Sequence, residues 1–163
     1  MRIMAIDPGY ERLGVAVLEK LPRQKETLLY SSCVQTSKTL PHAERLLKIA
    51  SEVKKVTEEF EPNALAIETL FLHTNQKTVM PVAEARGAVL VEAARAGLTV
   101  CEYTPLQIKM AVTGYGKSDK KQVAEMVKKL ISLPSQKRLD DEYDAIAIGL
   151  THLAHTFFTA KRG

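Results

Sequence analysis

Two apolar runs of this chain end in a carboxylate, an unusual place for an acidic side chain. The first run covers residues 3–6 and leads into Asp7 and a Pro-Gly turn; the second covers 64–67 and leads into Glu68. Aspartate is disfavoured in strands and is costly to bury without a partner, so each acid is either a turn residue or chemically active. Functional groups of open α/β sheets gather at strand ends, so two such acids on adjacent strands would lie together.

A second pair of acids stands near the end of the sequence. Asp141 and Asp144 are three residues apart, which places them on one face of an expected helix with Cβ atoms about 5–6 Å apart. The helix dipole alone also favours acids in a first turn, so this pair has a purely structural explanation as well. The adjacent Asp140 is the alternative to Asp141 as the functional acid. The three-residue spacing to Asp144 favours Asp141, and Asp140 then fits the N-cap position.

Four carboxylates that converge must be protonated or bridged by cations, because like charges repel. Hard cations such as Mg²⁺ prefer carboxylate oxygens and keep water ligands. Two such ions about 4 Å apart can activate a water and stabilise the leaving oxygen of a phosphodiester. The histidines do not suggest zinc: we expect His73, His152 and His155 to be surface or packing residues.

Basic residues gather in the stretch KSDKKQVAEMVKK at 117–129, which contains Lys117, Lys120 and Lys121, with Lys109 just upstream. A solvated helix face explains such a run, and a track for a phosphate backbone is the alternative. Phe71 follows Glu68 by three residues in a polar loop, where it could stack on an unpaired base or belong to a local core. No phosphate-cradling loop of the GxxxxGK[ST] or GxGxxG type occurs.

Periodicity and turn signals predict the elements that must position these groups. The expected strands cover 2–6, 13–19, 27–36, 63–68 and 98–105. The expected helices cover 41–62, 76–97, 105–114, 119–133 and 141–158. Within 41–62, one apolar face is expected to carry Leu46, Ala50, Val53, Thr57 and Phe60, flanked by Leu47 and Val56. Three early strands joined by short loops, then alternating helices and strands, predict an α/β fold with a mixed sheet.

The bulk numbers are compatible with one folded domain over 1–163, rich enough in apolar residues (45%) to bury a core. The formal charge of +4 permits a polyanionic partner. The two cysteines, Cys33 and Cys101, lie in strand-like runs and are expected to be reduced thiols. No signal-peptide pattern and no long apolar run is visible, so we expect a cytoplasmic protein without a membrane segment.

Several blocks together resemble the bacterial RuvC Holliday-junction resolvases of the RNase H-like superfamily. The blocks are AIDPGYERLGVAVLE, AIETLFLHTN, the ARG of AEARGAVL, EYTPLQIKMAVTGYGKSDKKQV and DEYDAIAIGLTH. They extend from residue 1 to about 153, nearly the whole chain.

The resemblance implies an RNase H-like fold, a mixed five-stranded sheet flanked by helices on both faces, with the first three strands antiparallel. It implies that Asp7, Glu68, Asp141 and Asp144 bind two Mg²⁺ (or Mn²⁺) and that the ends left after cleavage are a 5′-phosphate and a 3′-hydroxyl. Lys109 and Lys120 match lysines that contact DNA near the scissile phosphate, and Phe71 matches an aromatic that stacks on a disrupted base. The implied partners are four-way junction DNA, a second copy through the helix at 76–96, and the branch-migration proteins RuvA and RuvB.

Three other functions must be weighed. A YqgF-type nuclease shares the opening strand and acid but lacks the stretch GYGKSDKKQV. An actin-like ATPase needs two such halves around its nucleotide, and 163 residues provide one. A binding module that holds junction DNA without cutting it would not need four converging acids.

Overall fold

The computed structural model of the protein describes residues 1–70 and 76–160. Within them one sheet contains five strands in the order β3-β2-β1-β4-β5. The strands are β1 (Arg2–Asp7), β2 (Arg12–Glu19), β3 (Thr27–Gln35), β4 (Ala64–Glu68) and β5 (Thr99–Tyr103). The helices are α1 (His42–Phe60), α2 (Gln76–Arg95), α3 (Pro105–Thr113), α4 (Lys120–Leu130) and α5 (Asp140–Ala160).

The sheet is mixed, as the sequence predicted. Strands β1, β2 and β3 pair antiparallel as a meander, whereas β4 runs parallel to β1 and β5 runs parallel to β4. The parallel pairs follow from the helical crossovers: α1 carries the chain from the edge strand β3 back to the centre of the sheet, and α2 connects β4 to β5. The expected fold class is therefore confirmed.

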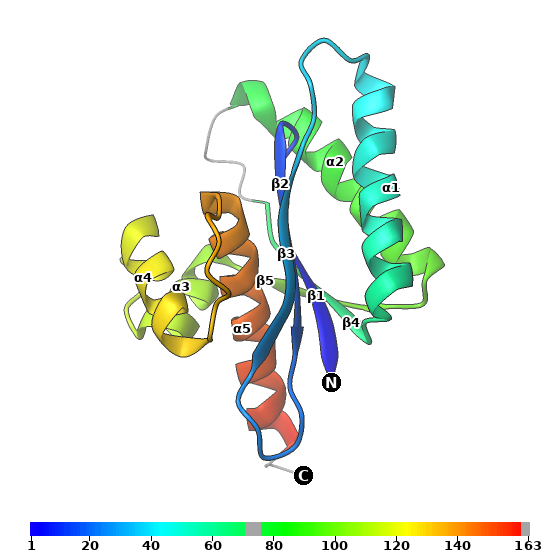
Figure 1. The fold of residues 1–163 in the computed structure, drawn as a ribbon. Coiled ribbons are helices and arrows are strands. Elements are labelled where there is room, and N and C mark those ends of the chain that lie inside the picture. The colour runs from blue at the N-terminus through cyan, green and yellow to red at the C-terminus, as the bar shows by residue number, and fades with distance from the viewer. Residues whose placement is uncertain (71–75, 161–163) are drawn as a thin grey trace.

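Helices cover both faces of the sheet (Figure 1). Helices α1 and α2 lie against one face, while α5 lies along the other with α3 and α4 beyond it. The predicted apolar face of α1 is partly wrong: the helix buries Arg45, Ile49, Val53 and Val56, and Leu47 is exposed. Arg45 can be buried because its guanidinium donates to the Thr36 hydroxyl at 3.0 Å.

The alternation of side chains along β1 decides which way Asp7 points. Ile3 and Ala5 pack into the core beneath α5, and Met4 and Ile6 pack into the core beneath α1 and α2. Because successive side chains of a strand point to opposite faces, Asp7 is on the α5 face. The register of β1 thus directs this carboxylate towards the N-terminal part of α5.

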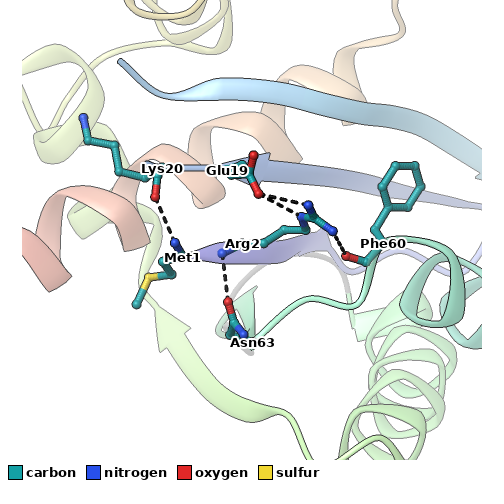
Figure 2. Close-up of polar contacts among 6 residues, drawn as sticks. All are labelled: Met1, Arg2, Glu19, Lys20, Phe60 and Asn63. Carbon is teal, nitrogen blue, oxygen red and sulfur yellow. Dashed lines mark hydrogen bonds and ion pairs between the residues drawn. The ribbon is translucent and has the colours of Figure 1, made fainter. Parts of the chain in front are cut away.

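The opposite end of β1 is fixed by polar contacts from three directions (Figure 2). The amino group of Met1 donates to the Lys20 carbonyl at 2.9 Å, and the Arg2 amide donates to the Asn63 side chain at 2.9 Å. The Arg2 guanidinium pairs with Glu19 at 3.0 Å and also donates to the Phe60 carbonyl. These bonds tie β1 to β2, to the end of α1 and to the start of β4, so the register of the central strand is specified at its first residue.

Helix α5 approaches the sheet closely where the sequence has glycine. A Cβ built on Gly14 of β2 would lie 2.0 Å from the backbone oxygen of Asp141. One on Gly149 of α5 would lie 2.4 Å from a methyl of Leu18. The two glycines let the first turns and the middle of α5 rest on the sheet, and Gly14 sets the height of the first turn above it.

The remaining expectations concern thiols, histidines and membrane association. Cys33 and Cys101 are half-buried free thiols. His152 is a packing residue whose Nδ1 is hydrogen-bonded to the Tyr103 hydroxyl at 2.9 Å, whereas Phe71 and His73 lie outside the described residues. Within residues 1–70 and 76–160, none of the helices combines the length and the apolar character needed to span a bilayer.

Candidate active site

Asp7 and Glu68 meet at the carboxyl ends of β1 and β4 because these neighbouring strands run parallel. Ile6 of β1 is in register with Ile67 of β4, so the acids that follow them lie side by side at the carboxyl ends of the two strands. Ala66 shares the core beneath α5, and Glu68 follows it by two residues on the same face. The sequence-based expectation that these two strand ends are neighbours is correct for this sheet.

The first turns of α5 bring two more acids, Asp141 and Asp144, over the carboxyl ends of these strands. The helix begins at Asp140, so the expectation that Asp140 is the N-cap is wrong. The residue before the helix is Leu139, and its backbone amide donates instead to the Glu142 carboxylate at 3.1 Å. That carboxylate also accepts a hydrogen bond of 2.7 Å from the Ser31 hydroxyl, which anchors the first turn of α5 to β3.

Three of the four predicted acids line one pocket of about 250 Å³: Asp7, Glu68 and Asp144. Lys109 of α3 and Lys120 of α4 line the same pocket. Its remaining lining residues are Pro105, Ile108, Val123, Ala147 and Ile148. Acids from three elements and lysines from two others therefore share one space with apolar walls, where charges are poorly screened by water.

Burial and mutual repulsion change the acidity of the carboxyls. Burial, followed by the charges of Asp144 and Glu68, raises the pKa of Asp7 to about 8, against a smaller opposing effect of Lys120. The pKa of Glu68 is also raised, first by burial and then by Asp144, while Lys120 and Lys109 oppose the shift. The protein alone therefore does not supply enough positive charge to keep all these groups ionised at neutral pH.

The two acids of α5 are each paired with a basic side chain from elsewhere in the fold. Lys120 donates to Asp144 at 2.7 Å, and the Arg12 guanidinium lies 2.6 Å from Asp141. The Cys33 thiol is 3.7 Å from the same Asp141 oxygen. Asp141 does not line the pocket, yet it is near enough for its charge to raise the pKa of Asp7.

Sequence reasoning missed Arg12 and Cys33 as residues of this site. The pairing of the meander contains the signal, since Gly14 is in register with both Asp7 and Cys33. Arg12 stands two residues before Gly14 and so on the same face of β2. Knowing that register, one could have placed both side chains beside the first turn of α5.

The other predicted lysines lie outside the pocket. Lys121 lines an adjacent hollow between α4 and the start of α5, together with Lys128 and Tyr143. Lys117 is exposed in the loop between α3 and α4. Helix α4 begins where expected, with Asp119 as N-cap in a reciprocal capping arrangement with Gln122, which fixes the position of Lys120 in the first turn.

The donors at this site suit a hard divalent cation, although no ready-made ligand set is present. The described side chains include no group of three or more His, Cys, Asp or Glu residues close enough together to hold a metal as they stand. The potential donors are nevertheless all carboxylates, and their raised pKa values mark a deficit of positive charge. Both features match what Mg²⁺ or Mn²⁺ requires from a protein.

The mixed sheet, with acids of β1, β4 and α5 gathered at the carboxyl ends of its inner parallel strands, defines an RNase H-like nuclease fold. The family model described as crossover junction endodeoxyribonuclease RuvC matches residues 3–152. This chain belongs to the RuvC family.

Individual relatives agree with that assignment. A crossover junction endodeoxyribonuclease RuvC from Desulfitobacterium hafniense is 42% identical over 156 residues, which covers 96% of this chain and 93% of the relative. The solved structure of Thermus thermophilus RuvC has a TM-score of 0.87 at 37% identity and covers 98% of this chain and 97% of that one. The T. thermophilus protein in complex with Holliday junction substrate gives a TM-score of 0.88 at the same identity, covering 96% and 94%.

Proposed function

We propose that this protein is a structure-specific endonuclease that resolves four-way (Holliday) DNA junctions by paired symmetric nicks, in homologous recombination and DNA repair. The observation that carries the proposal is the shared pocket of Asp7, Glu68 and Asp144 with Lys109 and Lys120. Membership of the RuvC family and the likeness to a RuvC solved with a Holliday junction support it.

Asp7, Glu68, Asp141 and Asp144 are the residues we assign to catalysis, as ligands for two Mg²⁺ ions, with Mn²⁺ as a substitute. Bound there, the two ions would supply an activated water and stabilise the leaving oxygen, giving 5′-phosphate and 3′-hydroxyl ends. The protein contributes rigid placement: Asp7 and Glu68 end two buried strands in register, and Asp144 is on a helix packed along the sheet. Apolar side chains such as Ile108, Val123 and Ile148 line the rest of the pocket, so a phosphate bound there would be partly shielded from solvent.

We assign DNA binding to Lys109, Lys117, Lys120 and Lys121, and base stacking at the crossover to Phe71. Lys109 and Lys120 are the best supported because they line the pocket with the acids. Lys117 and Lys121 are exposed and lie close in sequence to Lys120, so their charge is available to a phosphate backbone. The stacking role of Phe71 rests on the family resemblance alone.

The assembly we propose is a homodimer that contacts the branch-migration proteins RuvA and RuvB in the cytoplasm. Two symmetric nicks require two active sites, and the described residues 1–70 and 76–160 form one sheet with one pocket of this kind. The exposed apolar side chains of Met80 and Val91 on α2 favour this helix as the dimer contact.

The test is to incubate the purified protein with a labelled four-way junction and Mg²⁺, beside a linear duplex of the same sequence. We expect paired nicks at symmetric positions of the junction only. Asp7→Asn should lower cleavage by about three orders of magnitude, because it removes an anionic oxygen donor at the metal site, and should leave junction binding intact.

Two of the three other functions give different results in the same assay. A different RNase H-like nuclease without junction specificity would cut both substrates, and a pure binding module would retain the junction without cutting it in any divalent metal. Either result would contradict the proposal.

A further inference from the structure

Both carboxylates that α5 offers to the site are already held by cations of the protein. Asp141 is paired with Arg12 of β2 at 2.6 Å, and Asp144 is paired with Lys120 of α4 at 2.7 Å. The acid side chains are only 14% and 21% exposed, while Arg12 and Lys120 are 48% and 77% exposed. In each pair a largely buried carboxylate is therefore neutralised by a more exposed cationic side chain. When the pair opens, that side chain can move into solvent.

The Arg12 pair is the more informative of the two because it is built into the sheet. Arg12 is on β2, two residues from Gly14, the point where the α5 backbone touches the strand. Its partner oxygen on Asp141 is also the one nearest the Cys33 thiol, at 3.7 Å.

Two groups of the sheet thus converge on one oxygen of a carboxylate that the pocket does not include. A divalent cation that bound Asp141 would need the same lone pairs and would stand close to the guanidinium, and two like charges at that distance repel. Because Arg12 is half exposed, leaving the carboxylate for solvent costs it little.

We propose that Arg12 holds Asp141 as an internal counter-ion and competes with the divalent cation for it. Arg12 stabilises the metal-free site, and metal binding requires its displacement from Asp141. The inference rests on the proposed function, since it takes Asp141 as a metal ligand. If Arg12 instead oriented Asp141 for the metal, its removal would weaken metal binding, so the sign of the effect separates the two roles.

The experiment measures binding of Mn²⁺ alone to the full-length protein by isothermal titration calorimetry, without DNA. In Arg12→Gln the dissociation constant should fall by about fivefold, because a partly exposed ion pair no longer competes. Arg12→Lys should restore binding close to the wild-type value. Arg23→Gln, in the exposed loop between β2 and β3, removes the same charge far from the site and should change the constant less than twofold.

A thermodynamic cycle ties the effect to Asp141. Asp141→Asn should weaken Mn²⁺ binding, and adding Arg12→Gln to it should produce no further change, since the competed group is gone. The rise in melting temperature caused by Mn²⁺ should also be larger in Arg12→Gln than in the wild type. Arg12→Ala serves for both measurements should Arg12→Gln fold poorly.

Mn²⁺ affinity in Arg12→Gln and Arg12→Ala that is unchanged or weaker than in the wild type would overturn the inference and leave the proposed function standing. Mn²⁺ binding that Asp141→Asn leaves untouched would instead remove Asp141 from the metal site, and with it both the inference and that part of the proposed function.

Discussion

The two ends of β1 hold charge in opposite ways. At the first residue, Arg2 is paired with Glu19 and donates to the Phe60 carbonyl, and the amino group of Met1 donates to the Lys20 carbonyl (Figure 2). At the last residue, Asp7 faces Glu68 and Asp144, and its pKa is raised to about 8. One end is electrostatically satisfied by the protein, whereas the other is not.

The difference shows what each end contributes. Paired charges at the first end fix the register of the central strand and so the direction of every side chain along it. Unsatisfied charges at the last end cost stability, which the four fully buried residues between Arg2 and Asp7 allow the fold to tolerate. The proposed metal ligands lie at this last end, so the end of β1 that costs stability is also the one to which we assign function.

The largest expected effect concerns the close contact between Gly14 of β2 and the first turn of α5, beside the Asp7 end of β1. In Gly14→Ala the new Cβ would meet the Asp141 backbone oxygen at 2.0 Å, so the first turn of α5 or strand β2 must move. We expect a loss of about 3 kcal/mol in the free energy of unfolding, measured by urea denaturation. Gly149→Ala is the graded control, since its Cβ meets the movable end of Leu18 and gains helix propensity. An equal loss in both variants would show that the contact at Gly14 has no special weight.

The next largest effect is a pH dependence of the melting temperature caused by Asp7, measured in EDTA. Asp7 has a folded pKa of about 8 against an ordinary 3.8, so between these values the folded protein binds more protons than the unfolded chain. Its contribution to stability is therefore complete at acid pH and is lost as the pH rises towards 8. Asp7→Asn should melt about 5 °C higher than the wild type at pH 8, with the gap closing near pH 4. A gap that does not vary with pH would mean that Asp7 is not under electrostatic strain.

The sequence predicted the strands and helices of this fold because their signals are local. Hydrophobic runs and prolines place most ends within one or two residues, although α4 ends at Leu130 rather than at the expected residue 133. The face of α1 was harder to predict, because Leu47 fits the apolar pattern but is exposed, while Arg45 is buried through a hydrogen bond to Thr36. Which arginine finds a partner inside the fold depends on contacts between elements, and a local pattern does not contain them.

The candidate site shows the same limit. Asp7, Glu68 and Asp144 were recognisable from strand ends and helical spacing, and the parallel pairing of β1 and β4 brings the first two together. Arg12 and Cys33 were not recognisable, because they reach Asp141 only through the register of three strands. Asp140 was misassigned as the N-cap because α5 begins one residue earlier than the pattern indicated, so that Leu139 precedes the helix and donates its amide to the Glu142 carboxylate.

The smallest expected effect concerns the first residue of β1, Arg2, where the charges are paired within the protein. Arg2→Gln removes one positive charge, as Arg12→Gln does at the other end, but here it leaves the partly buried Glu19 without its partner. We expect the free energy of unfolding to fall by about 1 kcal/mol in urea denaturation, because a partly exposed ion pair and one hydrogen bond to a backbone carbonyl are lost. Mn²⁺ affinity and junction cleavage per folded molecule should stay at the wild-type values, since the change lies at the far end of the strand. Adding Glu19→Gln should recover part of the loss if the pair itself matters. A change of Mn²⁺ affinity in Arg2→Gln as large as that in Arg12→Gln would mean that net charge, rather than the place of each arginine, governs the site.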